Sequence, residues 1–177
     1  MSAEGLEHLR ALLREQGGLM ATLVDDAAAC AATASGPAQL AASGPRAVGR
    51  RAEYELLVEA IYEGYLLHYG SPRVIRTSEA DVGLLAGDQL YAIGLARLVA
   101  LGDTTAVAEL ADTITLSALA HGAGEEALAA AVWAAGARAV GWGSSDAHRR
   151  AKDLVYAGAP TAIEAMRTSA EAAPASP

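Results

Sequence analysis

Apolar residues recur at helical spacing along most of the chain. In residues 3–16, Leu6, Leu9, Leu12 and Leu13 lie three or four positions apart, so they share one face of a helix. The same period returns in later stretches, and no stretch shows the strict apolar–polar alternation of a half-buried strand. The pattern predicts an all-α protein, folded as a compact helical bundle.

Glycine and proline mark the ends of the predicted helices. Gly36-Pro37 and Gly44-Pro45 predict a loop over residues 35–46 with at most one helical turn, because proline lacks the amide hydrogen and restricts the residue before it. We expect one domain over residues 1–171 and a disordered tail over residues 172–177, which are small residues and proline. The predicted helices span residues 3–16, 19–34, 48–69, 78–101, 104–121, 125–140, 146–156 and 161–170.

Local signals refine three of these helices. In residues 48–69 the apolar residues form one stripe, and Glu59 and Glu63 fall mostly off it, on the face that such a pattern assigns to solvent. Ser78 is a good N-cap for the next helix. Gly102 and Asp103 combine a helix end with the cap of the following helix, which predicts a tight antiparallel pair.

Composition and charge exclude several function classes. The net charge is −8, and the 13 basic residues are spread thinly, so neither nucleic-acid binding nor a polybasic membrane patch is expected. The single cysteine, Cys30, lies among alanines without a basic neighbour and is expected to be a small buried hydrophobe rather than a reactive thiol.

The chain carries no predicted targeting or membrane segment. Residues 1–10 lack the basic start and apolar run of a signal peptide. The most apolar stretch, residues 82–101, contains Asp88 and Arg97, each of which would cost about 2.5–3.5 kcal/mol at the centre of a bilayer. We therefore predict a buried helix there, not a transmembrane one, and a cytoplasmic protein.

A row of small residues follows one face of the predicted helix 78–101. Ala80, Gly83, Gly87 and Gly94 lie at spacings of three, four and seven. Each glycine costs about 1 kcal/mol of helix propensity, so we expect close contact with another helix or with a ligand in compensation.

Three short motifs occur in an informative order. Leu66-Leu67-His68-Tyr69-Gly70 is followed by Leu84-Leu85-Ala86-Gly87-Asp88-Gln89-Leu90 and then by Ala100-Leu101-Gly102-Asp103. This order resembles the trans-polyprenyl diphosphate synthase family, in which one helix ends in Leu-x-His-Asp-Asp and the next carries Leu-Ala-Gly-Asp. The resemblance covers residues 54–120 and implies part of the isoprenoid synthase fold.

The chain differs from this family at the positions that bind Mg²⁺ in the family. The family's first aspartate motif binds Mg²⁺ through paired carboxylates, but Tyr69, Gly70 and Arg73 occupy the matching positions. The second motif is absent, since Asp146 and Asp153 are seven residues apart and unpaired. We therefore expect no catalytic residue and no metal ligand.

A chain with these motifs but without the aspartates resembles the small, non-catalytic subunit (component 1) of heterodimeric heptaprenyl diphosphate synthases. The resemblance implies an accessory subunit that supports isoprenoid chain elongation for a quinone side chain. It also implies that a catalytic prenyltransferase subunit holds the Mg²⁺ and that this chain binds no cofactor itself. Two alternatives remain: a helical binding module for an apolar or isoprenoid ligand, with or without self-association, and a standalone enzyme.

The candidate contacts to a ligand or partner come from the motif region. They are His68, Tyr69, Arg73, Gly83, Gly87, Asp88, Tyr91 and Gly94.

Outside that region two histidine features have ordinary explanations. Ser144-Ser145-Asp146 with His148 invites a hydrolase interpretation, but a nucleophile elbow needs a preceding strand, so helix capping is favoured. His148 is expected to be exposed. His121, at the end of its helix, is expected to be structural, since a cation suits that end of the helix dipole.

Overall fold

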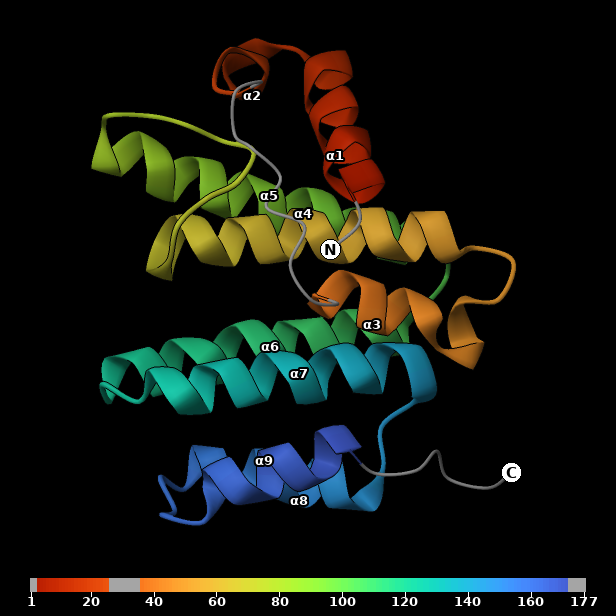
Figure 1. The fold of residues 1–177 in the computed structure, drawn as a ribbon, viewed down its shortest axis with the longest axis vertical. Helices are drawn as coiled ribbons and strands as arrows, with labels where there is room; N and C mark the ends of the chain where they lie inside the picture. Colours follow the sequence, from red (N-terminus) through yellow and green to blue (C-terminus); the bar gives the residue numbers. More distant parts are fainter. Residues whose placement is uncertain (1–2, 26–35, 172–177) are drawn as a thin grey trace.

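The computed structural model describes residues 3–25 and 36–171, and these form stacked layers of helices (Figure 1). The all-α prediction is confirmed, because the described residues contain helices and no strand beyond one isolated β-bridge. The helices are α1 (Ala3–Gln16), α2 (Gly18–Thr22), α3 (Pro37–Ser43), α4 (Arg51–Tyr69), α5 (Ala80–Ala100), α6 (Thr104–Gly122), α7 (Glu126–Trp142), α8 (Asp146–Tyr156) and α9 (Ala162–Glu171), with a short 3-10 helix at Pro45–Ala47.

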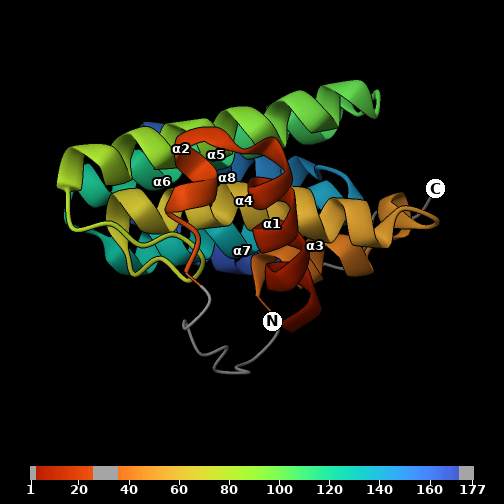
Figure 2. The same ribbon diagram turned by 90° about the horizontal axis from the view of Figure 1, so that it is seen from above.

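Helix α4 lies at the centre of the molecule and is covered on more than one face (Figure 2). One apolar core joins it to α3, α6 and α7 around Leu57, Ile61 and Trp133. A second core joins it to α1 and α5 around Leu9 and Leu90. A third core packs α8 and α9 against α6 and α7. The first two cores meet at α4, so this helix has no wide face left for solvent.

Helix α3 replaces the loop that the two Gly-Pro pairs predicted. Pro37 occupies its first turn, after Gly36 at the N-cap. Proline is favoured there, because that amide has no helical partner and the ring already holds a helical φ. Ala38 and Ala41 are fully buried between α4 and α7. The Gly-Pro pair therefore begins a helix here instead of breaking one.

The predicted helix over residues 19–34 is only partly described. Helix α2 ends at Thr22, and Val24 then forms an antiparallel bridge with Ile75. In this bridge the Asp25 amide donates to the Val74 carbonyl at 2.8 Å, and the Arg76 amide donates to the Leu23 carbonyl at 2.9 Å. Cys30 and the predicted tail over residues 172–177 lie outside the described residues.

The capped turn between α5 and α6 forms as predicted, but the predicted tight pairing of the two helices is wrong, since α5 packs mainly on α4 and α6 mainly on α7. Gly102 has a φ of 77°, and the Asp103 side chain accepts a hydrogen bond from the Ala106 amide at 3.0 Å. Asp103 also accepts from the hydroxyl of Tyr54 and, at 2.7 Å, from Arg46. Burial and the hydrogen bond to Asp103 raise the pKa of Tyr54 to about 12. The cap therefore also fixes the start of α4 to the α5–α6 corner.

Helix α5 has two different apolar faces. Its inner face packs on α4, while Leu84, Leu85 and Val99 on the other side are exposed. By length and composition α5 is apolar enough to cross a membrane, the one such helix among the described residues. A single helix of this kind is weak evidence for a span, because core helices of soluble proteins meet the same test.

The glycine row lets α5 approach α4 closely. A Cβ atom at Gly94 would lie 2.8 Å from Ile61 Cδ1 and 3.1 Å from the Leu57 carbonyl oxygen. A Cβ atom at Gly87 would lie 2.7 Å from His68 Nε2. These distances are too short for real atoms, so the glycines compensate their propensity cost through contact with α4 of the same chain. The interpretation that this face packs on a partner is therefore wrong for Gly87 and Gly94.

We predict that Gly94→Ala lowers the free energy of unfolding by about 1–2 kcal/mol. Overpacking against buried Ile61 costs about 1–3 kcal/mol, and the gain of about 1 kcal/mol in helix propensity offsets only part of it. Urea unfolding followed by circular dichroism measures the change. Gly122→Ala at the end of α6 is the matched control, since a Cβ atom there meets nothing within 4 Å. Equal stability of the two variants would contradict the packing role.

Candidate functional site

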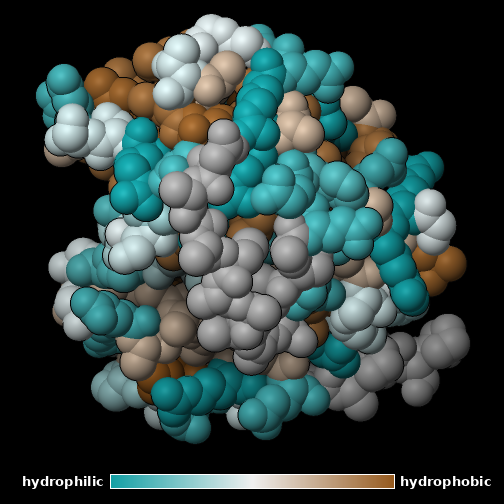
Figure 3. Space-filling model, turned by 45° about the horizontal axis from the view of Figure 1, so that its top comes forward, coloured by the Kyte–Doolittle hydropathy of each residue, from teal (hydrophilic) through white to brown (hydrophobic). Residues whose placement is uncertain are grey.

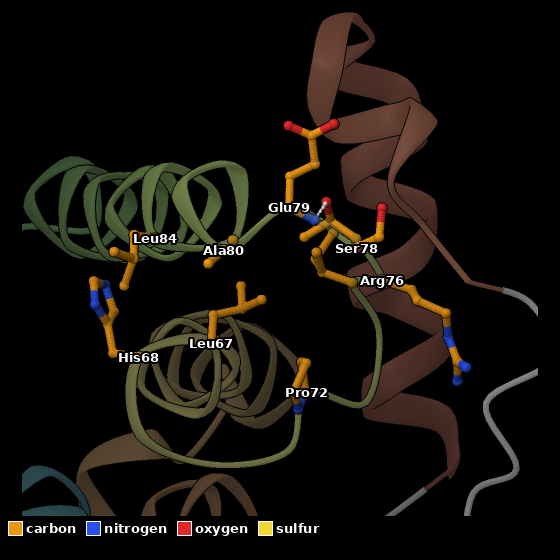
Figure 4. A pocket seen from close by; sticks show the side chains of 11 residues that line it. Leu67, His68, Pro72, Arg76, Ser78, Glu79, Ala80 and Leu84 are labelled. Carbon is orange, nitrogen blue, oxygen red and sulfur yellow. Dashed lines mark hydrogen bonds between the residues drawn. The ribbon is translucent and has the colours of Figure 1, made fainter.

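The motif residues converge where α4 ends and α5 begins. A cavity of about 550 Å³ lies there, bounded by the end of α4, the connecting segment 70–79 and the first turns of α5 (Figure 4). His68 and Leu67 face it from α4, and Ala80 and Leu84 face it from α5. The side chain of Arg76 points away from the cavity, toward Asp25, to which it lies 2.5 Å away. The cavity wall is mixed: Leu67, Pro72, Ile75 and Leu84 give it apolar surface, and His68, Thr77, Ser78 and Glu79 give it a nearly equal share of polar surface.

A buried carboxylate organises the segment between the two helices. Glu63 is fully buried, and its Oε1 accepts hydrogen bonds from the amides of Arg73 at 2.6 Å, Val74 at 2.6 Å and Ile75 at 3.2 Å. Its Oε2 accepts from Arg73 Nε at 3.1 Å. Three consecutive amides on one oxygen form a turn around that oxygen, so Glu63 sets the path of the connecting segment.

Arg73 lies inside this network instead of facing a ligand. Its Nη2 donates to Glu59 Oε2 at 2.8 Å, and its guanidinium lies 5.0 Å from the centre of the Tyr62 ring. Its carbonyl accepts from Arg10 Nη2 at 3.2 Å. Burial raises the pKa of Glu59, and Arg73 opposes that rise. The structure thus corrects two expectations, since Glu59 is buried rather than solvated and Arg73 is engaged by the fold.

His68, Asp88 and Tyr91 form a second group beside the cavity. The His68 ring stacks on Tyr91 with centroids 5.4 Å apart and planes at 3°, and its Nε2 lies 3.2 Å from Asp88 Oδ1. That Nε2 atom is buried without a hydrogen-bond partner, so its approach to Asp88 does not have the geometry of a hydrogen bond. The Asp88 side chain is 69% exposed. Burial raises the pKa of Tyr91.

Tyr69 stands where the family's motif has its first metal-binding aspartate. Its ring stacks on His121 from α6, with centroids 4.4 Å apart and planes at 3°. His121 Nε2 also lies 2.8 Å from the hydroxyl of Tyr65. His121 is therefore structural, as expected, and the half-exposed Tyr69 closes an aromatic row along α4.

The eight candidate residues separate into three environments. His68 and Gly83 line the cavity, and a Cβ atom at Gly83 would only touch Thr77 at an ordinary 3.5 Å. Tyr69, Asp88 and Tyr91 do not line the cavity but lie beside His68. Gly87, Gly94 and Arg73 belong to the packed interior.

The described residues assemble no set of donors suited to a metal ion. No group of three or more histidine, cysteine, aspartate or glutamate side chains converges anywhere in residues 3–25 and 36–171. Glu79 is the carboxylate in the cavity wall; Asp88 lies outside the lining and is exposed, and the oxygens of Glu63 face backbone amides and Arg73. The described wall therefore offers apolar side chains, an imidazole, hydroxyl groups and a single carboxylate.

The structure contains a second buried polar cluster, which no sequence pattern predicted. Glu109 of α6 accepts a hydrogen bond from Lys152 of α8 at 3.0 Å and lies 3.2 Å from His148 Nε2. Lys152 also donates to Asp112 at 2.7 Å. Burial works against ionisation of Glu109, but the hydrogen bonds from His148 and Lys152 outweigh it and lower the pKa to about 2. His148 is 5% exposed, so its expected exposure is wrong.

In this cluster Ser169, His148 and Glu109 lie in a row, and the arrangement has a structural role. His148 Nδ1 lies 3.2 Å from Ser169 Oγ, but the Ser169 hydroxyl donates to the Met166 carbonyl at 3.0 Å. Because that proton is directed to a carbonyl, the serine hydroxyl is not donating to the imidazole as the nucleophile of a hydrolase triad does. The predicted capping role of Ser145 is confirmed, since its hydroxyl accepts from the His148 amide at 3.1 Å.

Comparisons of the chain with protein-family models, with curated proteins and with solved structures find no match. The likeness to the polyprenyl synthases therefore rests on the three sequence motifs within residues 54–120 alone.

We expect Glu63→Gln to lower the free energy of unfolding by about 3 kcal/mol. The amide keeps one acceptor but leaves the buried Arg73 with half of its counter-charge, and breaking a buried ion pair costs about 3–5 kcal/mol. Denaturant titration gives the value. Glu53→Gln, at an exposed position of the same helix, is the control and should change stability by less than about 1 kcal/mol. A loss at Glu63 no larger than this would argue against the network.

The Glu109 cluster predicts a pH-dependent stability. Because folding lowers the pKa of Glu109 from 4.5 to about 2, its contribution is complete above about pH 5 and is lost as the pH falls toward 2. Glu109→Gln should therefore cost about 2–3 kcal/mol at pH 7, and this cost should shrink steadily below pH 4.5. Unfolding free energies of both proteins at pH 7, 5, 4 and 3 test this. Glu15→Gln, at an exposed position of α1, should show no such trend, and a pH-independent cost at Glu109 would refute the assignment.

Proposed function

We propose that this chain is a non-catalytic accessory subunit of a heteromeric polyprenyl diphosphate synthase that supports isoprenoid chain elongation for a quinone side chain. The main support for the proposal is the set of contacts at the end of α4, where the sequence resembles the family's first aspartate motif. Its polar residues are engaged in holding the segment 70–79, and its aromatic residues stack on their neighbours. In this arrangement the Mg²⁺ and the reacting diphosphates belong to the catalytic partner.

The chemistry of prenyl transfer supports this division of labour. A pyrophosphate leaving group carries several negative charges, and Mg²⁺ held by carboxylate oxygens is the usual means of neutralising them. Tyr69 and Gly70 supply no such oxygen, and Arg73 is bound to Glu59 and Glu63. The same helix end therefore lacks the charges that the reaction needs.

The outer face of α5 offers a surface for the partner. We define this face by the exposed residues Leu85, Gln89, Ala92, Ala96 and Val99. The exposed fraction is 64% for Leu85 and 57% for Val99. Beside it, a groove of about 600 Å³ runs between α5 and the α1–α2 corner, lined by Leu19, Met20 and Leu85. Figure 3 shows apolar side chains in brown at the top of the molecule, where α2 and α5 lie.

Co-expression with a catalytic polyprenyl synthase subunit from the same cell tests the function. We expect the two chains to copurify and to elongate an allylic diphosphate with isopentenyl diphosphate and Mg²⁺, whereas this chain alone forms no product. A catalytic subunit that is fully active and unbound without this chain would defeat the proposal, and so would turnover by this chain alone.

Charge introduced on the outer face of α5 should weaken the complex specifically. Leu85→Glu places a carboxylate in a surface that association would desolvate, and we expect at least a tenfold loss of affinity by calorimetric titration. The melting temperature should stay unchanged, because Leu85 is exposed in the free chain. Val48→Glu is the control, since Val48 is 68% exposed and lies outside this face, before α4. Equal affinity of the two variants would place the interface elsewhere.

A further inference from the structure

Arginines from separate segments of the sequence meet at one end of the helix stack. Arg46 donates to the Val140 carbonyl near the end of α7, and Arg50 donates to the Leu101 carbonyl at the end of α5, both at 3.1 Å. The ends of α5 and α7 and the start of α4 lie on the same side of the molecule in Figure 1. We call this group of side chains the arginine end, and it consists of Arg46, Arg50, Arg51 at the start of α4, Arg97 in the last turn of α5, and Arg138 beside Trp142 of α7.

The arginine end carries an excess of positive charge on a chain whose net charge is −8. Two carboxylates lie among the arginines: Asp103 pairs with Arg46 at 2.7 Å, and Glu53 shares the wall of a groove with Arg97. Arg51 and Arg97 are exposed, and within the described part of the chain neither of them forms an ion pair. Folding therefore concentrates cations that the sequence spreads thinly, and two of them face solvent without a counter-charge.

An exposed valine projects from the same end. Ala47 to Arg50 form a tight turn, closed by a hydrogen bond from the Arg50 amide to the Ala47 carbonyl at 2.9 Å. Val48 has a φ of −57° and a ψ of 128°, and Gly49 has a φ of 81°, which is the type II turn that favours glycine at its third position. Ala47 is fully buried, whereas Val48 is 68% exposed. The turn projects sideways from the helices in Figures 1 and 2, so the fold holds an apolar side chain out in water beside the arginines.

A membrane with anionic lipid headgroups matches this combination better than other anionic partners do. Guanidinium groups bind phosphate oxygens through several donors, and an apolar side chain that projects beyond them can enter the layer behind the headgroups. A nucleic acid offers the phosphates but no apolar layer behind them. An acidic protein offers carboxylates, but it would need a pocket shaped for one valine on a projecting turn.

We propose that the arginine end binds the surface of an anionic phospholipid membrane, with Arg50, Arg51 and Arg97 against the phosphates and Val48 among the headgroups. The arginine end shares no residue with the outer face of α5, so this inference stands independently of the accessory-subunit role. Arginine keeps its charge across the physiological pH range. The binding should therefore respond to salt, which screens the charges, and not to pH.

Cosedimentation of the full chain with lipid vesicles tests the proposal. The probes are vesicles of phosphatidylcholine alone and vesicles that contain about 30% phosphatidylserine, which gives them a negative surface potential. We expect the chain to sediment with the second kind and to remain in solution with the first. Raising the salt concentration from about 0.1 M to about 0.5 M should release it, since the surface potential is then screened over a shorter distance.

Two variants separate the charges from the apolar tip. The double variant Arg51→Gln and Arg97→Gln should bind about tenfold or more weakly, since each basic side chain near an anionic surface contributes about 1 kcal/mol. Val48→Glu should also weaken binding about tenfold, because a carboxylate replaces the inserted side chain. The matched control is Arg76→Gln with Arg167→Gln, which removes the same charge from two exposed positions outside the arginine end and should bind like the unmodified chain.

Three results would overturn the proposal. One is equal sedimentation with the two kinds of vesicle, and another is an equal loss of binding in the control and in the double variant. The third is binding to polyglutamate at the salt concentration at which the vesicles are not bound, which would assign the arginines to an acidic protein. Leu85→Glu, on the outer face of α5, should bind the vesicles normally. Failure of membrane binding therefore leaves the accessory-subunit proposal to its own test.

Discussion

One buried carboxylate holds together the part of the molecule on which the rest depends. Glu63 is fully buried in the central helix, and its two oxygens bind the amides and side chain of a segment ten to twelve residues later. A charge in that position is stable only when every lone pair is engaged. Arg73 supplies the counter-charge and shares it with Glu59. The direction in which α5 leaves α4, and with it the cavity in Figure 4, follows from this arrangement.

The network also joins the N-terminal helices to the centre of the fold. The Arg73 carbonyl accepts from Arg10, which donates in addition to the Asp25 carbonyl at 3.1 Å. The bridge between Val24 and Ile75 continues this connection through the backbone. Apolar packing of α1 on α4 does not by itself select a position along the helix axis, whereas directed hydrogen bonds do. The polar interior therefore sets the register in which the apolar surfaces pack.

The sequence predicted the long helices closely and the polar interior poorly, for a reason visible in α4. Periodicity assigns one face of a helix to the core, which is correct for α1 but wrong for a helix covered by α3, α5 and α7 together. Glu59 and Glu63 were therefore assigned to solvent. The signal that could have corrected this is the arginine ten residues after Glu63, which directly precedes the apolar pair Val74 and Ile75. His148 was missed similarly, because its partners Glu109 and Lys152 come from two helices whose pairing no local pattern encodes. The glycine row was recognised as a close contact, but spacing could not tell a helix of the same chain from a partner.

Helix α5 has one apolar face covered by α4 and another exposed to solvent, and the exposed face is suited to a partner. A helix that is apolar all round is normally buried all round, because neither side gains from contact with water. Here the glycine face is covered by α4, at distances that leave no room for anything else. Leu85 and Val99 on the opposite side remain in solvent, together with the alanines between them. Asp88 and Gln89 interrupt this face only near its middle, and Asp88 is turned toward His68. A partner that covered this face would therefore bury apolar area while desolvating few polar groups. This is the energetic condition for a stable association, and a non-catalytic subunit acts only through such an association.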